Sequence, residues 1–262
     1  MELFPPKIIK RSSNLLEFLG NQYDISDVNL NCLKQIENFE IVVICDDSYS
    51  MRCPATNATP FSCMRYTKDS RWEELKKIVS IVIDIATIFD KDGIDIYFLN
   101  REPLFNVTKK EELNKTFDIL PEGFTPLVKT LKKVLIDKKN IILTRNLLIL
   151  IATDGLPYDK TDDETVKKFK NLLKQREKQN IYISILACTD DEETIKEMNK
   201  WDKKIKNLDI IDDYNSERKE VIKFQGDNFK FSFGDYIVKA LLGSIDSYFD
   251  DLDEKKISSH IT

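Results

Sequence analysis

Histidine is nearly absent from this chain of 262 residues, whose single histidine is His260. Zinc centres with clustered histidine ligands and hydrolases with a Ser-His-Asp triad both need that side chain at the site. Zinc centres with clustered histidines are therefore excluded, and we expect no Ser-His-Asp triad. The patterns Gly-x-x-x-x-Gly-Lys and Gly-x-Gly-x-x-Gly are also missing, so neither glycine-rich loop that cradles nucleotide phosphates is expected.

Long apolar runs are missing as well. No run reaches the ~18 apolar residues of a membrane-spanning helix, so we expect no membrane segment. The first 20 residues mix Lys7, Lys10 and Arg11 with apolar side chains. They lack the unbroken apolar stretch and the small-residue cleavage site of a signal peptide, and we expect none.

The five cysteines are an odd number and are scattered along the chain. Such cysteines are expected to be the reduced thiols of an intracellular protein. Only Cys53 and Cys63 could bridge across a loop, and that would require an oxidising compartment. We therefore expect a cytoplasmic location.

Neither sign of charge dominates, because 40 basic side chains stand against 45 acidic ones for a formal charge of −5. A broad nucleic-acid surface is usually basic. Lysine-rich stretches such as 167–174 are expected to be solvated helix faces. We expect no nucleic-acid partner.

Apolar runs alternate with helical patterns along most of the chain. Residues 147–151 are apolar at every position, as in a strand that is buried on both faces. Strands are predicted at 41–44, 94–99, 147–151, 181–186 and 208–211, and helices at 72–89, 127–136, 161–178, 189–200 and 235–249. This alternation predicts an α/β fold, a doubly wound and mostly parallel sheet with helices on both faces.

No repeat or linker divides the chain into separate units. The first 35 residues fit the alternation poorly and are interpreted as an N-terminal extension. Residues 36–205 form the predicted core domain, and residues 206–262 add a strand and a helix that pack on it. The polar stretch 213–228 is expected to be a loop.

Oxygen-bearing side chains follow the predicted strands at the ends where ligands bind in α/β sheets. Asp46, Ser48 and Ser50 alternate after the first strand, so they can point into one concavity. Asp154 follows the fully apolar strand, and Thr125 precedes a helix. Carboxylates and hydroxyls without histidine or cysteine form a hard oxygen set that suits Mg²⁺, with Mn²⁺ and Ca²⁺ as alternatives. We expect a metal site there with room for water or an incoming ligand.

These motifs resemble a known family when they are taken together. Asp46-x-Ser48-x-Ser50, Thr125 in a Gly-x-Thr-Pro-Leu setting, and Thr153-Asp154-Gly155 look like the metal-ion-dependent adhesion site of von Willebrand factor A domains, over about residues 40–200. The resemblance implies a Rossmann-like fold. It also implies that the hydroxyls of Ser48, Ser50 and Thr125 contact the metal, with Asp46 and Asp154 binding directly or through water.

The function implied by the resemblance is non-enzymatic protein binding. In that family an acidic side chain of a partner protein often completes the coordination of the metal. Two features depart from the family pattern: Tyr49 stands where glycine is frequent, and an insertion spans Arg52–Lys68. We expect the insertion to lie beside the metal and to shape the choice of partner.

Three other interpretations stay open from the residues. A Mg²⁺-dependent phosphoryl-transfer enzyme of the haloacid-dehalogenase type would need a second acid two positions after Asp46, where Ser48 stands. A scaffold could bind partners without metal. Each of Asp46, Thr125 and Asp154, taken alone, could simply cap a helix or turn.

Overall fold

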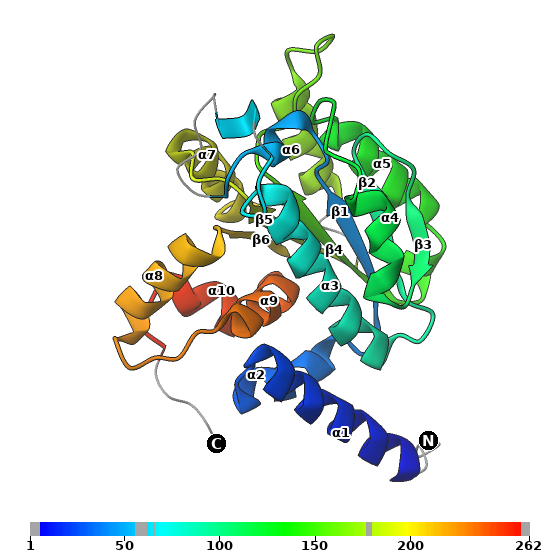
Figure 1. Ribbon diagram of the computed structural model, residues 1–262, viewed down its shortest axis with the longest axis vertical. Helices are drawn as coiled ribbons and strands as arrows, with labels where there is room; N and C mark the ends of the chain where they lie inside the picture. The colour runs from blue at the N-terminus through cyan, green and yellow to red at the C-terminus, as the bar shows by residue number, and fades with distance from the viewer. Residues whose placement is uncertain (1–5, 56–61, 65, 177–179, 258–262) are drawn as a thin grey trace.

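A computed structural model describes residues 6–55, 62–64, 66–176 and 180–257 of the protein (Figure 1). His260 and residues 56–61 and 65 of the predicted insertion lie outside the described residues.

A six-stranded sheet forms the centre of the molecule, in the order β3-β2-β1-β4-β5-β6. Its strands are β1 (Phe39–Cys45), β2 (Ile94–Phe98), β3 (Leu104–Val107), β4 (Asn146–Thr153), β5 (Ile181–Ala187) and β6 (Leu208–Ile211). Every neighbouring pair is parallel except β2 and β3, which are antiparallel. The prediction of an α/β fold with a mostly parallel sheet is therefore confirmed.

The edge strand β3 was not predicted. Its residues Leu104 to Val107 are half exposed and include Asn106 with a positive φ of 54°. An edge strand buries little surface, so it needs no apolar run. Only pairing with β2 makes it a strand.

Both faces of β1 are buried. Ile41, Val43 and Cys45 belong to one cluster of buried apolar residues, and Val42 and Ile44 belong to a second. Side chains of α1, α3 and α9 join the first cluster, and side chains of α5, α6 and α7 join the second. This burial explains why β1 and β4 are apolar at nearly every position.

The helices of the described residues are α1 (Pro6–Tyr23), α2 (Asp27–Cys32), α3 (Arg71–Phe89), α4 (Asn114–Phe117), α5 (Leu127–Asp137), α6 (Thr165–Gln175), α7 (Glu192–Asp202), α8 (Tyr214–Gln225), α9 (Phe233–Leu242) and α10 (Ser247–Asp250). In Figure 1, α3 crosses in front of the sheet, with α9 beside its lower half. Ser70 caps α3 by accepting a hydrogen bond from the Glu73 N–H.

Two predicted helix starts were wrong. Helix α7 is capped by Asp191, which accepts from the Thr194 N–H, while the Thr189 hydroxyl is engaged by Arg71 and by the Asp191 N–H. Helix α6 begins after Glu164 without a side-chain cap. Aspartate is a stronger N-cap than threonine, which explains the choice at α7.

The polar stretch 213–228 is mostly helix rather than loop. Asp213 caps α8 by accepting from the N–H groups of Asn215 and Ser216. The helix buries Glu217 and Val221 on one face. Its polarity reflects a buried ion pair and a solvated outer face, so apolar periodicity alone did not reveal it.

The N-terminal helices α1 and α2 pack against α9 from the C-terminal part of the chain. The buried Asp235 at the start of α9 accepts hydrogen bonds from the Ser26 N–H at 2.9 Å and from Asn29 Nδ2 at 2.7 Å. Leu16 and Leu19 of α1 lie in the same apolar cluster as the side chains of α9.

The cysteine expectation was wrong at one pair. Cys53 and Cys63 form a disulfide, while Cys32, Cys45 and Cys188 are free thiols. Disulfides are typical of proteins in an oxidising environment, so the cysteines do not indicate a reducing compartment. None of the described helices combines the length and the apolar character that crossing a bilayer requires.

Candidate metal site

The first carboxylate lies where β1 ends against β4. Cys45 pairs with Ala152 in the parallel register, and the Asp46 N–H donates to the Ala152 carbonyl at 2.9 Å. This places Asp46 beside Thr153, whose hydroxyl donates to Asp46 Oδ2 at 2.6 Å. Oδ1 of Asp46 accepts from the Ser48 N–H at 2.9 Å. The side chain is fully buried and held at both oxygens.

Two hydroxyls connect this loop to the second carboxylate. Ser48 Oγ lies 3.1 Å from Ser50 Oγ, and the Ser50 hydroxyl donates to Asp154 Oδ1 at 2.8 Å. The parallel pairing of β1 and β4 therefore brings together four of the five predicted ligands. All four carry oxygen donors, the atoms that Mg²⁺ prefers.

The fifth predicted ligand, Thr125, lies in the loop before α5, which contacts both the loop after β1 and the loop after β4. The Tyr49 N–H donates to the Gly123 carbonyl at 3.3 Å, and the Tyr158 N–H donates to the Thr125 carbonyl at 3.0 Å. Pro126 rather than Thr125 is the N-cap of α5, and no side chain supplies a cap bond. The buried Thr125 hydroxyl is thus not used for capping.

Glycine is required within this loop. Gly123 has a φ of +103°, and a Cβ there would collide with the Asn100 side chain. Asn100 in turn donates its backbone N–H to Asp47 Oδ1 at 2.8 Å. The second acid of the first loop therefore organises the neighbouring loops and turns away from the predicted metal ligands.

Arg71 is a member of the site that sequence reasoning missed. This first residue of α3 is buried, and its Nη1 donates to Asp154 Oδ2 at 2.8 Å. Its Nη2 reaches Asp190 Oδ1 and the Thr189 hydroxyl, each at 3.4 Å. Its place directly after the cap Ser70 was visible in the sequence, but the direction of its side chain was not.

Burial raises the pKa of both carboxylates. Burial, reinforced by Asp154, raises the pKa of Asp46 from 3.8 to about 7. Burial also raises the pKa of Asp154, against the opposing effect of the Arg71 guanidinium and the Ser50 hydroxyl. The guanidinium of Arg71 pairs with only one of the two buried acids. A divalent cation bound between the carboxylates would relieve the repulsion between them. The donor set of carboxylates and hydroxyls fits Mg²⁺.

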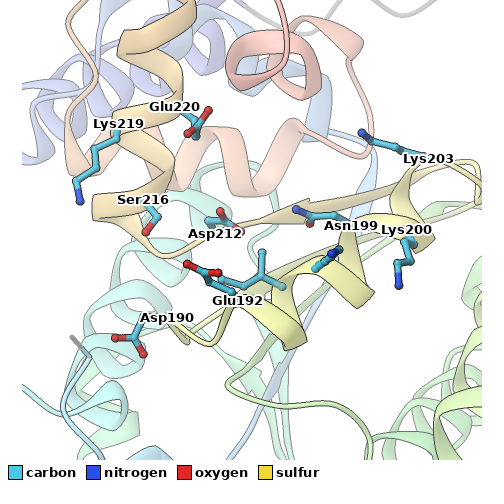
Figure 2. A pocket seen from close by; sticks show the side chains of 11 residues that line it. Asp190, Glu192, Asn199, Lys200, Lys203, Asp212, Ser216, Lys219 and Glu220 are labelled. Carbon is cyan, nitrogen blue, oxygen red and sulfur yellow. The ribbon is translucent and has the colours of Figure 1, made fainter. Parts of the chain in front are cut away.

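A cavity of about 700 Å³ lies between α7 and α8 (Figure 2). Charged side chains of both signs line it, among them Glu192, Lys196 and Lys219. Asp190 also lines this cavity and contacts Arg71, which contacts Asp154. The cavity is thus connected to the candidate site by one arginine.

Comparison with known proteins does not assign a family. No family model matches the chain, and no curated protein matches it. Among solved structures, the PilB minor pilin from Streptococcus sanguinis matches with 13% identity and a TM-score of 0.49. The match covers 82% of this chain, which spans 62% of that pilin chain.

The assignment to the von Willebrand factor A family is therefore corrected. No family model supports it, and one solved structure that the chain matches is described as a minor pilin. The site is therefore not assigned as a metal-ion-dependent adhesion site. Asp46, Ser48, Ser50, Thr125 and Asp154 stay a candidate site only through their own geometry.

Proposed function

We propose that this protein is a non-enzymatic binding protein that holds Mg²⁺, or Mn²⁺ or Ca²⁺, and captures an acidic side chain of a partner protein. The observation that carries the proposal is the hydrogen-bonded series that joins Asp46 to the Ser48 N–H, the Ser48 hydroxyl to the Ser50 hydroxyl, and the Ser50 hydroxyl to Asp154. Thr125 would complete it from the adjacent loop. Bound Mg²⁺ would offer a replaceable water position to a carboxylate.

The strand order supports this location. The chain moves outward from β1 to β3 on one side and from β4 to β6 on the other. We infer from this order a doubly wound, Rossmann-like arrangement, in which ligands bind where the direction of winding reverses. That point lies between β1 and β4, and Asp46 and Asp154 both follow those strands.

The side chains around Asp46 favour binding over catalysis. Its carboxylate contacts the Ser48 N–H and the Thr153 hydroxyl. Neither can serve as the general acid that a phosphoryl-transfer enzyme needs beside its nucleophile. We therefore keep the non-enzymatic proposal.

A metal-independent scaffold is the second candidate, and Arg71 favours it. The guanidinium already pairs with Asp154 at 2.8 Å, so one acid is compensated without a metal. In that function the same loops would contact a partner directly. Dependence on divalent metal separates the two candidates.

The partner surface would comprise the loops around the candidate ligands. Tyr49 and Phe124 are exposed on two of these loops, at 46% and 47%. A metal–carboxylate contact is a generic anchor, so neighbouring side chains would supply discrimination. We propose a protein partner, without nucleic acid or membrane, and the cytoplasmic location stays a prediction that the Cys53–Cys63 disulfide disfavours.

Calorimetric titration with Mg²⁺ tests the metal. The wild-type protein should bind one Mg²⁺ ion that Asp46→Ala does not bind. Asp163→Asn removes a charge from an exposed position in the loop after β4 and should bind like the wild type. Equal heats for the wild type and Asp46→Ala would contradict the proposed site.

A pull-down in Mg²⁺ and in EDTA tests partner capture. Proteins recovered by the wild type in Mg²⁺ should be lost in EDTA and with Asp46→Ala. Recovery of the same proteins in all three conditions would favour the scaffold. Replacing acidic residues of a recovered partner then identifies the captured side chain.

A further inference from the structure

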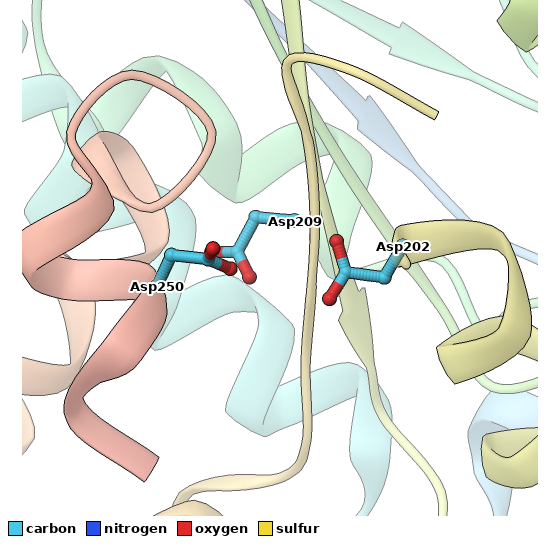
Figure 3. Close-up of side chains that lie close together, drawn as sticks. All are labelled: Asp202, Asp209 and Asp250. Carbon is cyan, nitrogen blue, oxygen red and sulfur yellow. The ribbon is translucent and has the colours of Figure 1, made fainter. Parts of the chain in front are cut away.

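A second group of acids lies away from the candidate site, at the edge of the sheet. Asp202 ends α7, Asp209 belongs to β6, and Asp250 ends α10. One carboxylate oxygen from each lies within 4.8 Å of the other two. Figure 3 shows the three carboxylates turned toward one another from three separate elements.

This spacing matches the geometry of one ion. Oxygens that bind a common Ca²⁺ at about 2.4 Å lie at most about 4.8 Å apart. A cavity of about 70 Å³ adjoins the three acids, and Asn199, Asp253 and Glu254 also line it. Further oxygen donors are therefore at hand for the six to eight that Ca²⁺ takes.

Asp209 has no hydrogen-bonding partner for its inner oxygen. The residue is 1% exposed, and its Oδ2 is buried without a hydrogen bond within the described part of the chain. A buried carboxylate oxygen without a partner is costly. Gly243 makes room for this oxygen, because a Cβ at that position would collide with it.

The positive charge of Lys239 opposes the rise in pKa at all three aspartates, yet burial still leaves each pKa above its usual value. Lys239 is buried nearby, but its Nζ pairs with Glu217 at 3.2 Å and with Asp253 at 2.8 Å. Across the described ranges, none of the three aspartates forms an ion pair with lysine or arginine. The acids exceed the available positive charge.

We propose that Asp202, Asp209 and Asp250 bind a divalent cation, with Ca²⁺ the best fit, which joins α10 to β6 and α7. Three carboxylates from separate elements suit the flexible coordination of Ca²⁺ better than the strict octahedron of Mg²⁺. Asn199 and Lys203 line both this cavity and the larger one between α7 and α8, which gives the ion a path from solvent. The ion would hold the C-terminal helices on the sheet.

The three carboxyl groups could otherwise hold protons. Burial, reinforced by Asp250, raises the pKa of Asp202 to about 7. Burial also raises the pKa of Asp209 to about 7, against the opposing charge of Lys239. Bound protons would relieve the same repulsion, so the experiment must separate the two cases.

Calcium titration in an Asp46→Ala background tests this site, because the first candidate site is then silenced. One calcium per chain should bind, and the melting temperature should rise by roughly 5–10 °C at a hundredfold excess over the dissociation constant. Adding Asp209→Asn should abolish both effects. Asp227→Asn, an exposed acid in the loop after α8, is the matched control and should change neither.

One further variant keeps the test valid if Asp209→Asn does not fold. Asp202→Asn changes a half-exposed ligand and should weaken calcium binding at least tenfold, while the apo protein melts at the same or a higher temperature because a disfavoured charge is removed. Retention of calcium binding in Asp209→Asn would overturn the proposal. It would also be overturned if Asp46→Ala binds no calcium and gains stability only on acidification, because the acids would then hold protons.

Discussion

Replacing Asp46 by asparagine tests whether the ionised carboxylate destabilises the metal-free fold or stabilises it. The pKa of Asp46 is raised from 3.8 to about 7, first by burial and then by Asp154. An acid whose pKa is higher in the folded state contributes stability that is fully present below pH 3.8 and is lost as the pH rises through about 7. Ionising Asp46 therefore lowers the free energy of unfolding by at most about 4 kcal/mol at about pH 8.

Asparagine keeps the shape of the side chain without its charge. Its Oδ1 can still accept from the Ser48 N–H, and the Thr153 hydroxyl can rotate to accept from the amide. In EDTA at about pH 8, Asp46→Asn should be more stable than the wild type by about 1–4 kcal/mol. The difference should shrink as the pH falls below 7 and disappear near pH 4.

Urea unfolding in EDTA at several pH values measures this difference. Trp72 and Trp201 are both buried, so their fluorescence reports unfolding. Asp163→Asn is the control for losing one negative charge at an exposed position. If Asp46→Asn is less stable than the wild type at about pH 8 by more than about 1 kcal/mol, ionised Asp46 stabilises the fold, and the reasoning is refuted.

Three further changes test other parts of the structure. Gly123→Ala should cost about 1–3 kcal/mol in urea unfolding and weaken Mg²⁺ binding, because its φ is +103° and its Cβ would collide with Asn100; unchanged stability would show that the loop adapts. Lys239→Met leaves the buried Glu217 and the partly buried Asp253 without their cation and should cost about 3–5 kcal/mol at neutral pH; a loss below about 1 kcal/mol would show that the pair is solvated. Reducing the Cys53–Cys63 disulfide should cost about 2–4 kcal/mol by calorimetry, and an unchanged melting temperature would mean that the closed loop unfolds independently of the sheet.

Much of the candidate site followed from its position after the strands. Asp46 and Asp154 directly follow apolar runs, and parallel strands place such positions at one edge of the sheet. Their hydrogen-bonded connection through Ser48 and Ser50 agrees with the prediction of convergence. The family assignment drawn from the same motifs was wrong, because a short motif specifies local chemistry and not ancestry.

The pairing of Arg71 with Asp154 could not be predicted from the sequence. An arginine after a helix cap can extend into solvent or turn inward, and the choice depends on which carboxylates the fold brings near. The same holds for Asp202, Asp209 and Asp250, which come from two helices and a strand. Their convergence depends on how the C-terminal helices pack against β6.

The sequence by itself determined the five buried strands, because a mostly apolar run is a local property that burial on both faces requires. It also determined that oxygen donors follow β1 and β4. The tertiary structure alone decided that β3 pairs as an edge strand, that a polar segment forms α8, and which buried charges meet. Those outcomes depend on long-range packing and on desolvated ion pairs, whose energies belong to the assembled fold and to no single segment.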